Sequence, residues 1–461
     1  MSEPRKLIVA IIDGLTPGVF EAAVESGRAQ TLAFLAAHGS YRRAVTTFPS
    51  LTPVCLSSIV TGAHPDVHEI PHLVWYSREE RRLVEYGSSF AAMRRAGALR
   101  SWRDSVYEMN ERHLGAGAVT VFEALEDAGL VPAAVNVTCY RGRTRHVPVV
   151  PGLTRAVHGP RRFFYYSLFE SDATGAAVGL LGRAEGSLDA YGASVGRWLV
   201  TRDGFDLLVY YLPDYDFASH LLGPDGAQEA LERSDAAIAA LLEAAGGPDE
   251  FLDRYALVVC SDHGQTDAEH AVRLQDAFSD LRVLAPRRAA AAADVAVTAS
   301  NRAGMVYRLD ECREDVRSLA GRAERAEGVD IVLFLEDGRG VARRGGEEVR
   351  FSPDGAGWSV AGEHALLDDA PDAFERAWAA LRNPNAGEII VSASSGYEFS
   401  DLAGRHHVGG GSHGSLLAGD SMVPMLTIGL DGDPRRTIDV APLALEHFGV
   451  APPAYARPRA A

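Results

Sequence analysis

Seven oxygen and nitrogen donors are spread along the chain from residue 13 to residue 413, and nearly all of them follow short apolar runs. They are three aspartates, three histidines and one threonine: Asp13, Thr52, Asp216, His220, Asp262, His263 and His413. Carboxylates and imidazoles that follow buried strands gather at one edge of an open α/β sheet, where such folds keep their ligand sites. This set of donors around one hydroxyl indicates a hydrolytic centre that holds two metal ions.

Each motif taken alone also has an ordinary structural interpretation. Asp216 and His220 are four residues apart, which puts both side chains on one helical face, but solvated Asp/His pairs share this spacing. Asp262-His263 fits a polar turn, Asp13 a helix cap and His413 a flexible glycine-rich loop. The joint occurrence of these residues is what favours a metal centre.

The elements that must position these residues follow from the apolar runs and the segments between them. Six runs predict strands of a mostly parallel sheet: 7–12, 131–137, 207–212, 256–260, 389–391 and 424–428. Four segments predict helices: 17–38, 119–128, 225–245 and 440–448. Residues 63–118 predict loops and short helices near the site, and residues 140–205 an alternation of loop and helix. The expected fold is therefore α/β, with a mostly parallel central sheet flanked by helices.

Thr52 is expected at the start of a helix. Threonine is a good N-cap and Pro53 suits the first helical position, so the helix would cover 54–61 and end at Gly62. A helix N-terminus offers partial positive charge to phosphate oxygens. A free threonine hydroxyl is a poor nucleophile at neutral pH, whereas a bound dication stabilises its alkoxide.

The pattern of apolar and polar residues changes after Gly264. Residues 276–385 include a hairpin-like alternation at 331–352, and we expect them to form an inserted cap or small α+β unit. Residues 1–275 and 386–455 would then make up a discontinuous catalytic core. Residues 456–461 are expected to be a tail.

Composition narrows the class of protein. The 461 residues are 47% apolar and 23% charged, as in ordinary globular proteins. A net charge of −17 argues against binding a nucleic-acid duplex, although bound metal ions would still let a small anion approach. Four cysteines without a CxxC pair, and no apolar run near the ~20 residues of a membrane span, predict a reducing cytoplasmic location without a membrane partner. No pattern indicates an oligomeric state.

The sequence resembles the alkaline phosphatase superfamily, in particular its nucleotide pyrophosphatase/phosphodiesterase and phosphonoacetate hydrolase branch. The resemblance spans about 5–275 and 388–450. The matching motifs are Asp13 after the first strand, Thr52 ten residues before Gly62, Asp216-x-x-x-His220 followed by Gly223-Pro224, Ser261-Asp262-His263-Gly264, and Ser412-His413-Gly414. The resemblance implies an alkaline-phosphatase-like fold.

The resemblance also implies how the donors are used. Two zinc ions would be bound, although Mn²⁺ and Fe accept similar ligands. One ion would be held by Asp216, His220 and His413, and the other by Asp13, Asp262 and His263 together with the Thr52 hydroxyl. Thr52 would attack phosphorus in line, giving a covalent phospho-threonine that water then hydrolyses.

Two positions depart from the pattern of this branch. Cys55 stands where an asparagine often contacts a phosphate oxygen, so it is at most a weak substrate contact. Pro53 lacks an N–H, so backbone donors from Val54 and Cys55, or another side chain, would have to compensate. Thr47, in Thr-Thr-Phe-Pro-Ser, is a second possible nucleophile, but its spacing to Gly62 is five residues too long.

The function expected from these observations is hydrolysis of a small phosphodiester or phosphoanhydride. One alternative is a phosphonate hydrolase or phosphate monoesterase on the same site. A monoesterase needs a cation for the additional negative charge, and Arg42 and Arg43 are expected at a solvated strand edge instead. The other alternative is a metal-binding regulatory protein whose catalysis has decayed. Aromatic residues at 73–76 and 163–166 could hold a substrate, although core packing is favoured for each.

Overall fold

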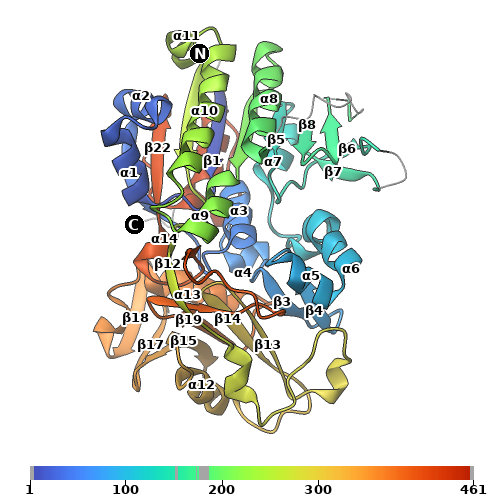
Figure 1. Ribbon diagram of the computed structural model, residues 1–461, viewed down its shortest axis with the longest axis vertical. Helices are drawn as coiled ribbons and strands as arrows, with labels where there is room; N and C mark the ends of the chain where they lie inside the picture. The colour runs from blue at the N-terminus through green and yellow to red at the C-terminus, as the bar shows by residue number, and fades with distance from the viewer. Residues whose placement is uncertain (1–4, 151–153, 173, 176–185, 457–461) are drawn as a thin grey trace.

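The computed structural model describes residues 5–150, 154–172, 174–175 and 186–456 (Figure 1). Its central layer is an eight-stranded sheet in the order β2-β22-β11-β1-β10-β5-β8-β9. These strands are β1 (Lys6–Ile12), β2 (Ser40–Val45), β5 (Pro132–Val135), β8 (Arg162–Tyr165), β9 (Phe169–Ser171), β10 (Leu207–Leu212), β11 (Tyr255–Cys260) and β22 (Met422–Ile428). Strand β1 pairs in parallel with β10 and β11, and only β22 and β9 run antiparallel to their neighbours. The predicted α/β fold with a mostly parallel sheet is confirmed.

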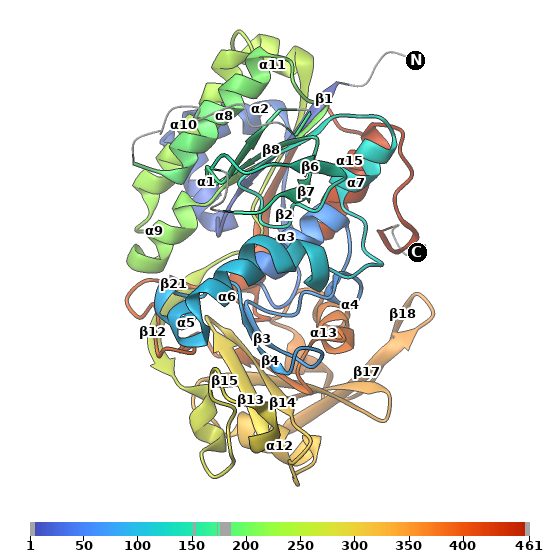
Figure 2. The same ribbon diagram turned by 90° about the vertical axis from the view of Figure 1, so that its right-hand side faces the viewer.

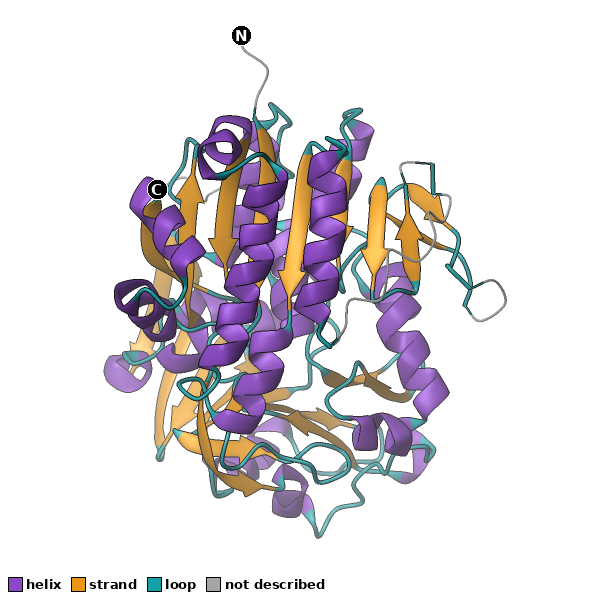
Figure 3. Cartoon of the chain, turned by 45° about the horizontal axis from the view of Figure 1, so that its top comes forward, coloured by secondary structure: helices purple, strands orange, loops and turns teal. Residues whose placement is uncertain are grey.

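Helices cover both faces of this sheet, because successive side chains of each strand point to opposite sides. Ile8 and Ile12 pack against one helical layer and Leu7 and Val9 against the other. The first layer, prominent in Figure 3, contains α1 (Pro17–Ser26), α2 (Gln30–His38), α8 (Leu188–Thr201) and α10 (Gln228–Ala244). The second contains α3 (Thr52–Thr61), α7 (Val121–Asp127) and α15 (Val440–His447). The short α11 (Pro248–Arg254) leads into β11.

A second, antiparallel sheet lies below the first in Figure 1 and has the order β13-β14-β19-β15-β16-β17-β18. Its strands are β13 (Val295–Ser300), β14 (Ala303–Arg308), β15 (Val329–Glu336), β16 (Arg339–Arg344), β17 (Glu347–Asp354), β18 (Gly357–Gly362) and β19 (Ile389–Ala393), and it carries α12 (Val316–Glu324) and α13 (Ala373–Arg382). The hairpin predicted at 331–352 is present as β15–β17. The prediction that 389–391 returns to the central sheet is wrong, because β19 pairs with β14 and β15. A fully buried apolar strand has the same sequence signature in either sheet.

Other expectations need local corrections. The helix predicted over 17–38 is two helices, because Gly27 ends α1 in the left-handed conformation at φ 70°. The region 140–205 contains strands as well as loops and a helix: β6 (Thr144–His146), β7 (Val157–Gly159), β8 and β9. The aromatic run at 163–166 lies largely on β8, where β-propensity and packing outweigh the loop assignment. Of the predicted tail 456–461, all but Ala456 lies outside the described residues.

The segment 63–118 forms the wall next to the sheet edge. It contains α4 (Pro65–His68), the hairpin β3 (Val74–Ser77) and β4 (Arg82–Glu85), α5 (Phe90–Ala96), α6 (Ala98–Arg103) and a π-helix, η1 (Asp104–His113). Figure 2 shows α5 and α6 beside the junction of the two large sheets. A small sheet of β20 (Gly396–Phe399), β12 (Thr266–Val272) and β21 (Gly411–Ser412) holds the 409–414 loop against α9 (Asp214–Leu222). The other short helices in the described part of the chain are α14 (Ala418–Ser421) and the 3-10 helices η2 (Leu274–Phe278), η3 (Ala290–Ala292), η4 (His364–Leu367), η5 (Thr437–Asp439) and η6 (Ala454–Ala456).

Within the described ranges, no helix has the length and apolar character needed to cross a membrane. All four cysteines are buried and unpaired.

Candidate active site

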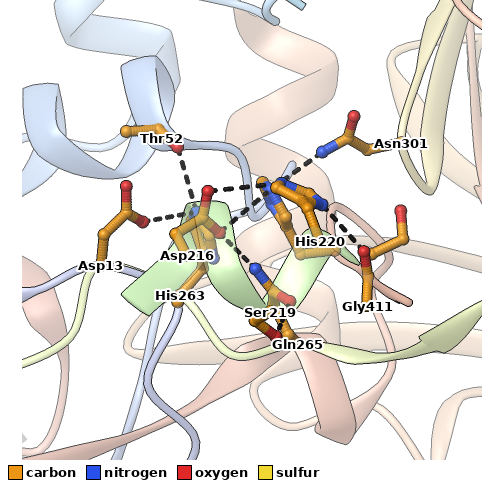
Figure 4. A network of polar contacts seen from close by, with 12 residues as sticks. Asp13, Thr52, Asp216, Ser219, His220, His263, Gln265, Asn301 and Gly411 are labelled. Carbon is orange, nitrogen blue, oxygen red and sulfur yellow. Dashed lines mark hydrogen bonds and ion pairs between the residues drawn. The ribbon is translucent and has the colours of Figure 1, made fainter. Parts of the chain in front are cut away.

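The carboxyl ends of three adjacent parallel strands bring four of the predicted donors together. Figure 4 labels three of them, Asp13, Asp216 and His263. Asp13 follows β1, Asp216 lies in the first turn of α9 after β10, and Asp262 and His263 follow β11. His413 comes from the loop after β21. These five side chains are at most 5% exposed. The sequence-based expectation that they meet at one sheet edge therefore holds.

The donors form two groups that share His263. In each group the ligand atoms lie within 4.8 Å of one another: Asp13, Asp262 and His263 in one, and Asp216, His263 and His413 in the other. His263 Nε2 is 3.3 Å from Asp13 Oδ1 and 3.6 Å from Asp262 Oδ2. His220 lies beside the second group, with its Nε2 3.3 Å from Asp216 Oδ2.

The three histidines are held in the tautomer that a metal ligand requires. Each places Nδ1 against a backbone carbonyl: His220 against Gly411 at 2.8 Å, His263 against Gly264 at 3.1 Å, and His413 against Ser50 at 2.8 Å. A carbonyl oxygen can only accept, so Nδ1 carries the proton, and in the neutral imidazole Nε2 then keeps its lone pair. Such backbone contacts orient metal-binding imidazoles.

The carboxylates show that a cation fits between these groups. Asp13 Oδ1 and Asp262 Oδ2 are buried and receive no hydrogen bond from the residues that the structure describes, and both face His263 Nε2. Burial, reinforced by Asp216 and Asp262, raises the pKa of Asp13 well above its usual range. Burial and the neighbouring His263 lower the pKa of His413. Electron-rich atoms packed in this way favour a bound dication.

Three further residues orient the aspartates, and sequence reasoning did not identify them. The Tyr211 hydroxyl donates to Asp13 Oδ2, and the Gln265 amide donates to Asp216 Oδ1. Ser219 in turn donates to the Gln265 carbonyl oxygen, which fixes the direction of that amide. Gln265 follows the Ser-Asp-His-Gly motif directly, and this proximity was the available signal.

Thr52 lies among these donors. Its Oγ1 is 3.1 Å from His263 Nε2, and the side chain lines the cavity at the N-terminus of α3. The helix begins at Thr52 itself, with Leu51 as the cap, so the predicted N-cap position is wrong by one residue. The N–H groups of Val54 and Cys55 both donate to the Leu51 carbonyl at 2.9 Å, so neither is free for an oxyanion.

Two other sequence-predicted residues do not reach the cavity. Cys55 is fully buried, and its Sγ lies 3.9 Å from the carbonyl oxygens of Thr47 and Pro49. Thr47 is also buried and lines a different, small cavity. Arg42 and Arg43 lie on the edge strand β2, where they pair with Asp433 and Glu21.

Five of the seven donors line a cavity of about 670 Å³: Asp13, Thr52, Asp216, His220 and His413. Most of the remaining lining is aromatic, aliphatic or hydroxyl-bearing, and none of the described lining residues is Lys or Arg. The apolar and aromatic members are Leu73, Tyr86, Phe90, Met109, Tyr165, Tyr166, Tyr211, Phe217 and Leu221. Trp75, Tyr76, Phe163 and Phe164, by contrast, are core residues. Each of the two aromatic segments, 73–76 and 163–166, therefore contributes some residues to the cavity and others to the core.

Asn301 is a site residue that the sequence did not reveal. It occupies the turn between β13 and β14 at φ 57°, a conformation that asparagine tolerates. Its Nδ2 lies 2.8 Å from His413 Nε2. Figure 4 shows the Asn301 side chain beside the other site residues. The second large sheet thus contributes a polar side chain to the cavity. His407 also lines it and stacks on His220 with ring centroids 4.0 Å apart.

Comparisons with known proteins agree with this architecture. The profile of the family described as type I phosphodiesterase / nucleotide pyrophosphatase matches residues 7–416. Phosphonoacetate hydrolase from Sinorhizobium meliloti 1021, solved with phosphonoformate, is 20% identical with a TM-score of 0.60, and the match covers 96% of each chain. Murine ectonucleotide pyrophosphatase/phosphodiesterase 5 is 12% identical with a TM-score of 0.60, covering 98% of this chain and 97% of that one. An inactive form of the murine protein has been solved with AMP. No curated protein matches the sequence.

Proposed function

Since the chain belongs to the type I phosphodiesterase / nucleotide pyrophosphatase family, we propose that it hydrolyses a small phosphodiester or phosphoanhydride through Thr52. The observation that carries this proposal is the Thr52 hydroxyl, 3.1 Å from His263 Nε2 and inside a ring of buried donors. A hydroxyl at a helix N-terminus, surrounded by metal-type ligands and open to a cavity, suits nucleophilic attack on phosphorus.

We propose that two divalent ions, zinc in the first instance, occupy the centre. Asp13, Asp262 and His263 would hold one ion, with Thr52 beside it; Asp216, His220 and His413 would hold the other. The mixture of imidazole and carboxylate donors suits zinc, and Mn²⁺ or Fe are also compatible. When bound, such ions supply positive charge that stabilises an alkoxide and the phosphoryl oxygens.

The residues of the chain would then act in two steps. Thr52 Oγ forms a bond to phosphorus as the leaving oxygen departs from the opposite side, giving a phospho-threonine that keeps the second ester group. Water then displaces Thr52 in the same manner. Tyr211 and Gln265 hold Asp13 and Asp216 in position throughout. The N-terminus of α3 adds partial positive charge next to the phosphoryl group.

The charge of the cavity favours a diester over the alternatives. A monoester carries an additional negative charge, and phosphonoacetate carries a carboxylate; each needs a cationic partner beyond the metals. No Lys or Arg is among the described lining residues. A phosphodiester is singly charged, and its ester substituents fit the aromatic wall. The complete donor set also argues against a decayed, purely binding protein.

The test compares Zn²⁺- and Mn²⁺-supported hydrolysis of bis(p-nitrophenyl) phosphate with that of p-nitrophenyl phosphate. We expect diester preference that Thr52→Ala abolishes and Thr52→Ser partly retains. Thr47→Ala is the matched control and should keep wild-type activity. Monoester preference, or full activity of Thr52→Ala, would overturn the proposal.

A further inference from the structure

A second cavity of about 730 Å³ lies on the other side of the segment that walls the active site. It is bounded by the start of β4, by α6 and η1, and by the loop at 284–289 that precedes β13. Figure 1 shows this loop, in yellow, below α5 and α6. A volume of this size is in the range of small-molecule sites.

The charge of this cavity is opposite to that of the molecule. Seven arginines line it, against three acidic residues, in a chain whose net charge is −17. The arginines are Arg81, Arg82, Arg100, Arg103, Arg112, Arg287 and Arg288. We call this the arginine cavity. Concentrating like charges in one hollow is costly unless an anion offsets their repulsion.

The acids of the cavity neutralise only part of this charge. Arg82 binds Asp104 at 2.7 Å and Glu80 at 2.5 Å, and Arg112 lies 3.0 Å from Glu80. Arg103 lies 3.4 Å from Glu108. These pairs account for all three acids.

Arg81 pairs with Asp310, which is outside the lining, and Arg287 donates to the Arg94 carbonyl. Two of the seven arginines are therefore left for a ligand. Within the described ranges of the chain, the guanidinium groups of Arg100 and Arg288 make no hydrogen bond or ion pair, and both residues are exposed. They come from separate elements, α6 and the 284–289 loop, that line the same cavity. Two free guanidinium groups from different walls suit a ligand with at least two anionic groups, because each can bind one of them with two N–H donors.

The arginine cavity is separate from the active-site cavity, although both contact η1. Ser105 and Met109 line the active-site cavity, whereas Asp104, Glu108 and Arg112 line the arginine cavity. No residue is common to the two linings. A ligand there would therefore not be the group under attack by Thr52.

We propose that the arginine cavity is a binding site for a small polyvalent anion, such as a compound with several phosphate groups. This site is additional to the proposed catalytic centre and does not depend on it. Arg100 and Arg288 are the principal contacts. Arg287, whose side chain donates to a carbonyl and not to an acid, adds positive potential.

The test uses pyrenetetrasulfonate, a fluorescent polyvalent anion that contains no phosphorus ester. Its fluorescence anisotropy is titrated with the full-length protein at low ionic strength. Replacing Arg100 and Arg288 together by alanine should weaken binding by about tenfold or more. The matched control replaces Arg95 and Arg339 by alanine, which removes the same charge from positions outside the cavity. The affinity of this control variant for the probe should stay at the wild-type value.

A competition experiment tests whether the cavity prefers anions that carry several charges. Inorganic tripolyphosphate should displace the probe, whereas chloride at the same ionic strength should do so much less. The proposal is overturned if wild type does not bind the probe, if both double variants bind it equally, or if chloride competes as well as tripolyphosphate. Thermal melting of each variant checks that it is folded.

Discussion

The two sides of the active-site cavity are built in different ways. On the side of the central sheet, Asp13, Asp216 and Asp262 follow neighbouring strands whose pairing fixes their spacing. On the other side, Asn301 comes from a turn of the second large sheet, and Ser105 and Met109 come from η1. The first side consists of buried charged donors, and the second of neutral polar, aromatic and aliphatic groups.

In the proposed function, the side of the central sheet carries out the reaction and the opposite side selects the substrate. A metal centre tolerates little displacement of its ligands, so it is placed on rigid strand ends. In the proposed reaction, substrate groups away from phosphorus would contact loops and helix faces, where substitution changes shape and charge without disturbing the ligands. Changes on the sheet side should therefore abolish activity, whereas changes on the opposite side should adjust it.

The largest effect is expected from Asp262→Ala. Bound metal should fall from two ions per chain to one or none, and diester hydrolysis should fall by at least about a thousandfold. Metal analysis of the dialysed protein, together with initial rates, measures both. Asp267→Ala removes an exposed carboxylate of the same segment and should change neither. Retention of two ions by Asp262→Ala would refute the ligand assignment.

A smaller effect is expected from Asn301→Gly. Glycine keeps the φ of 57° but removes the amide that lies 2.8 Å from His413 Nε2. A bound ion would take the lone pair of His413 Nε2 and leave this amide free to donate to the substrate. We expect a loss of about tenfold in kcat/KM with both ions retained, as for the loss of one hydrogen bond to the substrate. Asp337→Gly, at another positive-φ turn, is the control and should leave the kinetics unchanged. A loss of metal would instead place Asn301 among the residues that support the ligands.

Sequence reasoning succeeded on one side of the cavity and not on the other, for a physical reason. Asp13, Asp216 and Asp262-His263 each come within four residues after a strand of the central sheet, so local patterns locate them. Asn301 also follows a strand, β13, and Met109 lies in η1, but only the packing of segments far apart in the sequence brings these two side chains to the cavity. The strand at 389–391 shows the same limit: its apolar run predicted a strand, but not which sheet would take it.

Leu221→Arg tests the role of charge on the selectivity side. Leu221 is 77% exposed and lines the cavity, so an arginine fits there without disturbing the core. We expect the ratio of monoester to diester hydrolysis to rise about three- to fivefold, since an exposed cation is partly screened by solvent. Leu222→Arg, which lies outside the lining, should leave the ratio unchanged. An equal rise in both variants would indicate a general charge effect.

The smallest effect on catalysis is expected at Glu85, which supports the Gly87–Ser88 part of the wall through hydrogen bonds. Burial raises the pKa of Glu85 from its ordinary value of 4.5 to about 7. The folded state therefore holds this proton more tightly than the unfolded state. Its contribution to stability is complete below pH 4.5 and is lost as the pH rises to about 7.

Glu85→Gln should remove this pH-dependent loss of stability, which corresponds to at most roughly 3 kcal/mol in the free energy of unfolding. Urea unfolding at pH 5 and pH 8 measures the change in the free energy of unfolding. The exposed Glu347→Gln should behave like wild type. If the pH dependence of the free energy of unfolding is unchanged in Glu85→Gln, other groups cause it. The value of kcat/KM at pH 7 should be nearly unaffected by this substitution.

The most direct test of the central claim is mass spectrometry of the enzyme quenched in acid during turnover of bis(p-nitrophenyl) phosphate. We predict a p-nitrophenyl phosphate adduct on the peptide that contains Thr52, absent from Thr52→Ala. An active enzyme that gives no adduct there, or an adduct on Thr47 instead, would contradict the assignment of Thr52 as the nucleophile.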